Sequence, residues 1–245
     1  MDKPNLNQYI REVELLKEQL PPITQYPFNI PSIEKLTNLK FHPNVTFIIG
    51  ENGSGKSTLL EAIATLYGFN PEGGSRNFNF TTKATHSTLH QHMKLIKGVK
   101  QPKDGFFLRA ESFYNVATKV DELGSDLYAS YGGISLHGQS HGESFMSLVM
   151  ERFRGNGVYI LDEPEAALSP TRQLALITRM HQLIQEKSQF IIATHSPIIM
   201  AYPNCKIYDV DAGYREVKYD ETDHYQITKD FLNNPSKFID LLLEE

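Results

Sequence analysis

The chain has 245 residues, of which 40% are hydrophobic and 22% charged, and its formal net charge is -5. This length is enough for one α/β domain with a sizeable core, so we expect a single domain over residues 1–245. The negative balance argues against binding of nucleic acid over the whole surface, although it leaves a local basic patch open.

The sequence shows no membrane or secretory feature. No apolar run approaches the roughly 18–20 residues that span a bilayer, and the N-terminus has no signal-peptide core. The single cysteine, Cys205, excludes a disulfide within the chain, which suits a reducing compartment. We therefore expect a cytoplasmic protein without a membrane partner.

The first 49 residues predict one helix and three strands. Apolar side chains follow helical spacing over residues 6–20, and a Pro-Pro pair would stop that helix. Strand-like segments follow at residues 26–30 and 33–41. The apolar run over residues 45–49 then predicts a buried strand.

A complete phosphate-binding loop follows this strand. Its G-x-x-x-x-G-K-S pattern precedes an amphipathic run over residues 57–67, which gives the strand–loop–helix context that the motif requires. The glycines let the backbone N–H groups point at phosphate oxygens, and the helix adds its positive end. We expect a nucleoside triphosphate to be bound by Gly50, Glu51, Asn52, Gly53, Ser54, Gly55, Lys56, Ser57 and Thr58.

Two acidic residues complement this loop about a hundred residues later. Lys56 would reach the β- and γ-phosphates, and the Ser57 hydroxyl would ligate Mg²⁺. Asp162 and Glu163 close an apolar strand at residues 158–161. Asp162 fits a second Mg²⁺ ligand, directly or through water, and Glu163 fits the group that polarises the attacking water.

The remaining segments predict the architecture. Residues 69–105 predict loops and short strands, and further helices are expected at 144–153, after Ser169-Pro170, and near the C-terminus. Apolar strands are expected at 106–108, 158–161, 190–193 and 206–210. Apolar strands alternating with helices predict an α/β fold with a mainly parallel sheet covered on both faces.

Two further segments carry weaker patterns. Ser140 and Gly142 precede the helix at 144–153, where a hydroxyl and a glycine offer a second anion site for the nucleotide of another molecule. An ordinary helix cap is the favoured interpretation when this segment is taken alone. His195 ends the strand at 190–193, where it is placed to touch a γ-phosphate.

The chain resembles an ATP-binding-cassette ATPase in four motifs that occur in the same order. After the phosphate loop come Ser140-His141-Gly142-Glu143, Leu161-Asp162-Glu163-Pro164 and Ala193-Thr194-His195-Ser196. The chain is most similar to small, stand-alone bacterial ATPases of the AAA family and to the heads of structural-maintenance-of-chromosomes and double-strand-break-repair ATPases. The resemblance implies a P-loop fold, ATP and Mg²⁺ as ligands, and hydrolysis of ATP to ADP and phosphate.

The resemblance also implies roles for individual residues. Lys56, Glu163 and His195 would be catalytic. Ser140 and Gly142 would contact the γ-phosphate held by an opposing subunit, so that two chains dimerise around two ATP molecules.

Three further positions are less clearly matched to the family. Glu111 stands where the family has a Mg²⁺- and water-sensing glutamine, and a surface carboxylate is an equally favoured alternative. Stacking on adenine is one role for Tyr26 or Phe28, and core packing is the favoured one for each.

The interval between Glu111 and Ser140 is too short for a coiled-coil arm or a transporter's helical subdomain. We therefore expect a short helical signature subregion at 112–153 and an ATPase head alone, acting as a dimerising switch. Its partner would be a separate effector protein, for example a nuclease, in DNA repair or anti-phage defence. The alternatives are a regulatory ATP-binding module with slow ATPase activity and a transporter energy subunit. Nucleic acid stays open as a partner because lysines recur over residues 94–103, although a solvated loop is favoured there.

Overall fold

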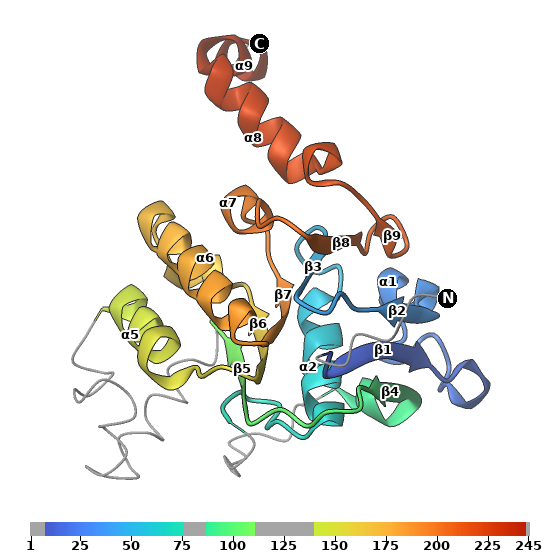
Figure 1. Cartoon of the computed structure of the whole chain (residues 1–245). Coiled ribbons are helices and arrows are strands. Elements are labelled where there is room, and N and C mark those ends of the chain that lie inside the picture. Colours follow the sequence, from blue (N-terminus) through green and yellow to red (C-terminus); the bar gives the residue numbers. More distant parts are fainter. Residues whose placement is uncertain (1–7, 76–86, 111–139, 244–245) are drawn as a thin grey trace.

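The structure, a computed structural model, describes residues 8–75, 87–110 and 140–243. Its centre is a sheet in the order β5-β6-β7-β3-β8-β9, in which every pairing is parallel except that of β8 with β9 (Figure 1). This arrangement confirms the predicted α/β class and the mainly parallel sheet. The strands are β3 (Val45–Ile49), β5 (Asp104–Arg109), β6 (Gly157–Asp162), β7 (Gln189–Ala193), β8 (Cys205–Asp209) and β9 (Arg215–Glu216).

Helices cover both faces of this sheet because its strands carry apolar side chains on both sides. Phe47 belongs to a buried cluster with side chains of α5, α6 and α7, whereas Ile48 belongs to a second cluster with α1 and α2. The helices are α1 (Pro31–Lys35), α2 (Lys56–Tyr67), α5 (His141–Ser147), α6 (Pro170–Gln185), α7 (Pro197–Met200), α8 (Asp223–Asn233) and α9 (Pro235–Leu243). A π-helical turn (Leu148–Arg152) continues α5, and short 3-10 helices are η1 (Lys17–Gln19), η2 (Thr88–His92), η6 (Pro164–Ala167) and η7 (Tyr219–Glu221).

A second, antiparallel sheet in the order β2-β1-β4 lies near α2 (Figure 1). Its strands are β1 (Ile10–Leu15), β2 (Asn38–Lys40) and β4 (Met93–Lys97). The helix predicted over residues 6–20 is therefore wrong in its described part. Ile10, Val13 and Leu16 are spaced as on one helical face, but β1 is paired on both edges, and this pairing outweighs the weak local preference.

Two predicted strands before the phosphate loop are also wrong or too long. Residues 26–30 form turns, because Pro27 lacks an N–H group for a sheet ladder. The strand predicted at 33–41 shortens to β2, because Pro31 occupies the first turn of α1, where its missing N–H costs nothing.

Gln189 links the two sheets through a fully buried side chain. Its Oε1 accepts hydrogen bonds from the backbone N–H groups of Tyr9 (3.0 Å) and Ile10 (2.8 Å). Its Nε2 donates to the carbonyl groups of Ile10 (2.8 Å) and His42 (3.0 Å). One amide thus satisfies four backbone groups at the junction of the sheets.

We expect Gln189→Leu to lower the free energy of unfolding by about 3 kcal/mol or more. Each buried backbone group left without a partner costs about 1–3 kcal/mol, and leucine can replace none of the four hydrogen bonds. Gln185→Leu, in the exposed last turn of α6, is the matched control and should change stability by less than about 0.5 kcal/mol. Chemical denaturation measures both variants, and equal losses would contradict the linking role.

The C-terminal helices α8 and α9 project from the body of the molecule (Figure 1). Neither helix has a buried residue. Within the part of the chain that the structure describes, no helix is long and apolar enough to cross a membrane. The pair nevertheless exposes large apolar side chains, namely Ile227, Phe231, Leu232, Ile239, Leu241, Leu242 and Leu243.

Candidate functional site

The phosphate loop joins the end of β3 to the start of α2. Gly50, Gly53 and Gly55 have φ angles of 151°, 78° and 95°, which residues with a Cβ atom rarely adopt. A Cβ atom at Gly50 would also lie 2.7 Å from Val210 Cγ2 and 2.8 Å from Asp211 Oδ2. The loop path therefore depends on glycine at these positions.

Lys56 is folded back into the loop. Its side chain is buried, and Nζ donates to the carbonyl oxygens of Gly50 and Glu51, each at 2.9 Å. Burial lowers the pKa of Lys56, while the carboxylates of Glu163 and Asp162 act in the opposite direction. The ammonium group is thus held by neutral acceptors at the position where phosphate oxygens would replace them.

Ser57 and Asp162 face each other from the start of α2 and the end of β6. Ser57 Oγ donates to Asp162 Oδ1 over 3.0 Å. Mg²⁺ takes oxygen ligands at about 2.0–2.1 Å in octahedral geometry, in which adjacent ligands lie about 2.9 Å apart. The two oxygens are therefore spaced as adjacent ligands of one Mg²⁺ ion, so this pair fits the predicted metal.

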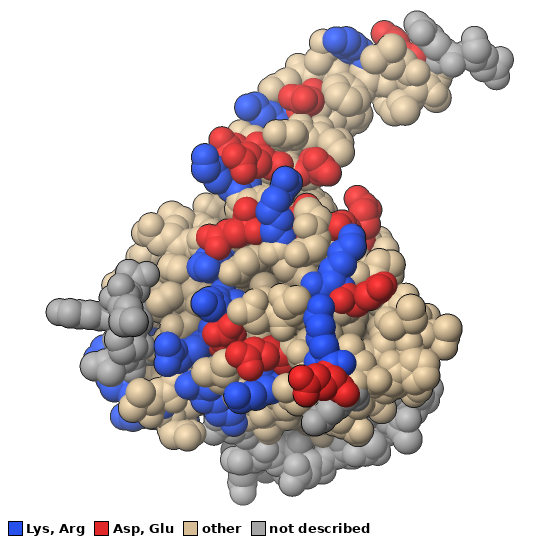
Figure 2. Space-filling model, turned by 90° about the vertical axis from the view of Figure 1, so that its right-hand side faces the viewer, with Lys and Arg blue, Asp and Glu red and all other residues tan. Residues whose placement is uncertain are grey.

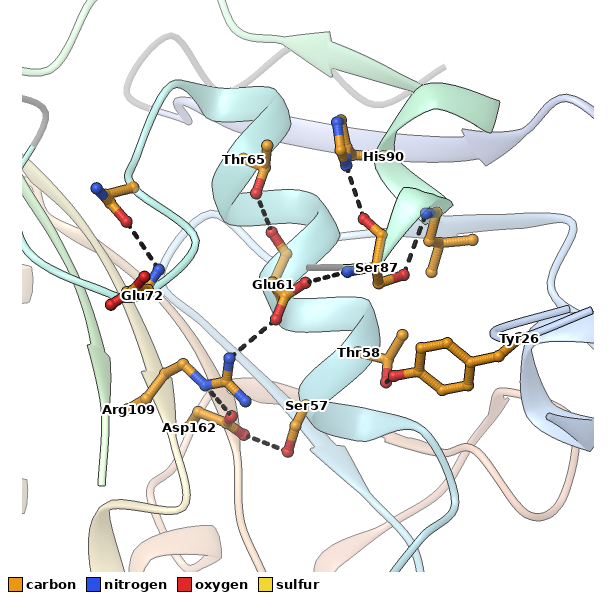
Figure 3. A network of polar contacts seen from close by, with 12 residues as sticks. Tyr26, Ser57, Thr58, Glu61, Thr65, Glu72, Ser87, His90, Arg109 and Asp162 are labelled. Atoms are coloured by element: carbon orange, nitrogen blue, oxygen red, sulfur yellow. Dashed lines mark hydrogen bonds and ion pairs between the residues drawn. The ribbon is translucent and has the colours of Figure 1, made fainter. Parts of the chain in front are cut away.

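Arg109 and Glu61 extend this contact into a network (Figure 3). Arg109 Nε lies 3.4 Å from Asp162 Oδ2, and its Nη1 lies 2.9 Å from Glu61 Oε2. Glu61 Oε1 accepts from the backbone N–H of Ser87 over 2.9 Å. Sequence analysis did not single out Arg109, although it ends an apolar strand, and β5 pairs it with Asp162. The network fixes the orientation of Asp162 from a neighbouring strand and from α2.

Glu163 lies beside His195 at the next strand end. Its backbone is left-handed, with φ of 50°, and its N–H donates to the Ala193 carbonyl over 3.0 Å. Such conformations are uncommon for glutamate and concentrate at functional sites. Glu163 Oε1 lies 3.4 Å from His195 Nε2, and both side chains are partly exposed. Nε2 itself is buried and makes no hydrogen bond within the described part of the chain, so a donor position on His195 stays unused beside Glu163.

Glu165 holds the loop that carries His195. Its carboxylate accepts from Thr194 Oγ1 over 2.8 Å and from the backbone N–H of His195. Sequence analysis missed Glu165, although it stands only two residues after Glu163 in the same acidic motif. Two carboxylates of this motif thus contact the His195 segment, one at its ring and one at its backbone.

Ser140 is the exposed N-cap residue of α5. Its Oγ and its N–H donate to Glu143 Oε2 at 2.7 and 3.0 Å, and these hydrogen bonds lower the pKa of Glu143. Gly142 lies close to the loop after β6, since a Cβ atom there would be 2.8 Å from the carbonyl oxygen of Ala167. The segment is an exposed helix start whose serine hydroxyl is hydrogen-bonded to Glu143.

A cavity of about 230 Å³ lies beside part of this site. Its lining includes Ser57, Asp162, Glu163 and His141, which follows Ser140. Three residues of small side chains complete its lining, namely Ala110, Ala166 and Ala167.

The other predicted positions have different outcomes. Glu111 lies outside the described residues, as do residues 112–139 of the predicted signature subregion. Phe28 is buried and packs edge-on against His92, which confirms the favoured prediction of core packing. Tyr26 is 57% exposed, and its hydroxyl lies 3.3 Å from Thr58 Oγ1, so core packing is wrong for this residue.

Two lysines of the lysine-rich segment have neighbours in the structure, one acidic and one aromatic. Lys94 lies 3.9 Å from Glu14, and Lys97 lies over the ring of Tyr67. Figure 2 shows Lys and Arg interspersed with Asp and Glu on this side of the molecule.

Within the described ranges, no group of three or more His, Cys, Asp or Glu could hold a metal ion. The Ser57–Asp162 pair would therefore need oxygens of a bound phosphate or water to complete a metal site.

Two family models match the chain. One, described as "AAA domain", matches residues 28–123, which contain the phosphate loop. The other, described as "AAA domain, putative AbiEii toxin, Type IV TA system", matches residues 144–201, which contain Asp162, Glu163 and His195.

The chain is also similar to individual curated proteins and solved structures. The guanosine import ATP-binding protein NupO of Bacillus subtilis (strain 168) is 29% identical over 166 residues, 59% of this chain and 31% of that protein. The structure of cbiO1 from Clostridium perfringens, part of the ABC transporter complex cbiONQ, aligns with a TM-score of 0.48 and 19% identity, over 97% of this chain and 100% of that chain. The SMC head domain from Thermotoga maritima aligns with a TM-score of 0.42 and 16% identity, over 82% of this chain and 94% of that chain. The match spans about a third of the length of NupO and of the nucleoside import protein NupA of Lactococcus lactis.

Proposed function

We propose that this chain, which is a P-loop ATPase of the AAA and ATP-binding-cassette type, works as a nucleotide-dependent dimerising switch in the cytoplasm. The observation that carries the proposal is the convergence of the phosphate loop, the Ser57–Asp162 pair, Glu163 and His195 on the carboxyl edge of one sheet. Open parallel sheets bind their ligands at this edge.

The loop would hold the triphosphate of ATP. Its backbone N–H groups and the start of α2 would contact phosphate oxygens, and Lys56 would exchange its two carbonyl acceptors for oxygens of the β- and γ-phosphates. Ser57 and Asp162 would hold Mg²⁺, and Glu111 is proposed as a further ligand. When bound, the ion supplies positive charge that neutralises the phosphates.

Glu163 would orient the attacking water and accept its proton. Its carboxylate lies at the end of β6, partly exposed, beside a cavity that also contains the Ser57–Asp162 pair. A positioned base of this kind contributes about 10²–10⁴ in rate. His195, held beside Glu163, would donate a hydrogen bond to the γ-phosphate.

Dimerisation would complete the site. Ser140 and Gly142 lie at the start of α5. In one protomer they would contact the γ-phosphate that Lys56 of the other protomer binds. The Ser140 hydroxyl now donates to Glu143, and a phosphate oxygen would replace that acceptor. Arg172, 3.3 Å from Glu143, offsets the negative charge that Glu143 would bring close to the phosphate. ATP would thus join the two protomers, and hydrolysis would separate them.

Chromatography of the hydrolysis-deficient variant Glu163→Gln tests the dimer. We expect it to elute as a dimer with ATP and Mg²⁺ and as a monomer without them. The double variant Glu163→Gln/Lys56→Ala is the matched control: it should stay monomeric under the same conditions, because its loop lacks the lysine that would bind the phosphates of ATP. Monomer elution of Glu163→Gln under all conditions would rule out the switch.

The physiological output is proposed to be control of a separate effector protein, for example a nuclease, in DNA repair or anti-phage defence. The description of the second family model supports defence, and the apolar side chains exposed on α8 and α9 support a protein partner. Stimulation of ATP hydrolysis by DNA would favour repair. If the chain hydrolysed ATP slowly and bound a partner protein only when nucleotide is present, the regulatory alternative would be favoured.

A transporter energy subunit is the second candidate function, because NupO is an import ATP-binding protein. This function requires a membrane permease as partner. Its test is co-sedimentation of the chain with membranes of its own cell, and recovery only in the soluble fraction would count against it.

Tyr26 is proposed as the platform on which adenine stacks. It is exposed and lies next to Thr58, at the end of the phosphate loop. Stacking of a base on an aromatic side chain is worth about 1–3 kcal/mol, so Tyr26→Ala should weaken ATP binding by about tenfold or more. Ile23→Ala, which removes another exposed apolar side chain before the loop, should leave affinity unchanged. Calorimetric titration compares the two, and equal affinities would exclude the stacking role.

A further inference from the structure

His224, in the first turn of α8, contacts the histidine of the nucleotide site. His195 Nδ1 lies 3.0 Å from His224 Nε2, and the two ring centroids are 5.2 Å apart. His224 also lines a pocket of about 160 Å³ beside the phosphate loop, together with Gly50 and Glu51. A residue of the projecting C-terminal helices therefore reaches both the phosphate loop and His195.

The start of α8 is anchored to the segment that follows His195. Thr222 is buried, its Oγ1 accepts from the N–H of Tyr225 over 3.3 Å, and it donates to the carbonyl of Tyr219 over 2.8 Å. The hydroxyl of Tyr219 donates in turn to the carbonyl of Pro197 over 2.9 Å. These contacts fix the position of the His224 ring relative to the loop that carries His195.

The contact between the rings determines where the proton of His195 lies. Burial, followed by the neighbouring His195, lowers the pKa of His224, so its ring is neutral at pH 7 and has one N–H. If a neutral His195 carried its proton on Nδ1, its buried Nε2 lone pair would lie 3.4 Å from the Glu163 carboxylate, which repels it, and no described group would donate to it. With the proton on Nε2, the positive end of the N–H bond lies near the Glu163 carboxylate, although the two groups are not hydrogen-bonded in the structure, and Nδ1 accepts from His224.

We propose that His224 is a positioning residue whose Nε2–H donates to His195 Nδ1 and so keeps the proton of His195 on Nε2, the nitrogen that lies 3.4 Å from Glu163. This proposal rests on the proposed function in one respect: during turnover, the same Nε2–H would donate to the γ-phosphate. His224 acts through His195 and does not contact the phosphate. The orientation of α8 is thereby coupled to the hydrogen-bonding state of the nucleotide site.

Two substitutions of His224 separate a hydrogen-bonding role from a packing role. His224→Phe keeps a ring but removes the donor, whereas His224→Gln loses the ring but places an amide N–H near the position of Nε2. We expect His224→Phe to lower kcat by about tenfold to a hundredfold, with KM for ATP nearly unchanged. Losses of this size are typical when a residue that orients a ligand-contacting side chain is removed. His224→Gln should retain most of the activity. The reverse order, with Phe active and Gln inactive, would overturn the proposal.

The ring protons can be observed without turnover. We expect the ¹⁵N NMR spectrum of nucleotide-free wild-type protein, labelled on histidine, to show His195 with a protonated Nε2 and a bare Nδ1. The signals are assigned by their loss in His195→Gln. In His224→Phe, the signals of His195 should move toward a mixture of both tautomers. A proton on Nδ1 in the wild-type protein, alone or together with one on Nε2, would overturn the proposal.

The spectrum also separates this proposal from the proposed function. If the wild-type protein failed to hydrolyse ATP, the proposed function would fail, whereas the tautomer of His195 would still be decided by the spectrum. If hydrolysis were normal but the spectrum showed a proton on His195 Nδ1, only the proposed role of His224 would be contradicted.

Discussion

Glu163→Gln is expected to lower kcat for ATP hydrolysis by about 10²–10⁴ while leaving ATP affinity within about threefold. The amide keeps the size of the carboxylate and its place beside His195, but it cannot accept a proton from water. The loop residues that hold the phosphates are unchanged. Phosphate release at saturating ATP measures the first quantity, and equilibrium titration with ATP and Mg²⁺ measures the second.

Glu186→Gln is the matched control for this substitution. Glu186 is exposed at the C-terminal end of α6, just before β7 begins, and so lies at the sheet edge opposite the site. Its turnover should equal that of the wild-type protein. A wild-type rate for Glu163→Gln itself would show that another group activates the water.

Lys56→Ala is expected to weaken ATP binding by about a hundredfold or more. The buried ammonium group would make at least one charge-assisted hydrogen bond to each of two phosphates, each worth about 1.5–3 kcal/mol, and about 1.4 kcal/mol corresponds to a factor of ten. Without nucleotide, the ammonium group donates to the carbonyl oxygens of Gly50 and Glu51, and burial lowers its pKa. The variant loses these two hydrogen bonds but keeps the rest of the core, so it should still fold when nucleotide is absent.

Lys40→Ala serves as the control, since Lys40 is an exposed lysine on β2. Isothermal titration gives the affinities, and thermal unfolding without nucleotide shows whether each variant is folded. A folded Lys56→Ala variant that binds ATP as tightly as Lys40→Ala would contradict the role of the loop lysine.

Local sequence patterns predicted the central sheet and its phosphate loop because their signals lie within short segments. β3, β6 and β7 are buried over their whole length, so they are visible as continuous apolar runs. The loop has a fixed pattern of glycines, and Ser169-Pro170 marks the start of α6 by the chemistry of its cap.

Long-range contacts could not be predicted in this way. β1 has helical spacing in the sequence, and only its pairing with β2 and β4 makes it a strand. The aromatic side chain of Tyr26 favours core packing from sequence alone, whereas the turn at residues 26–30 leaves it exposed.

The residues that hold the site in place from outside its motifs could not be predicted for the same reason. Arg109 and Glu61 are 48 residues apart, and His195 and His224 are 29 apart. No short motif joins the members of either pair. Only the register of β5 with β6 brings Arg109 to Asp162, and only the anchoring of α8 brings His224 to His195.

The most direct test of the shared site is to mix two inactive variants, Lys56→Ala and Ser140→Arg. In a symmetric dimer, each mixed pair has one site with both changes and one with neither, so the account predicts that mixing restores about a quarter of wild-type ATP hydrolysis. Each variant alone should be inactive at the same total concentration. No recovery on mixing two folded variants, or full activity of Ser140→Arg alone, would contradict a site built from both protomers.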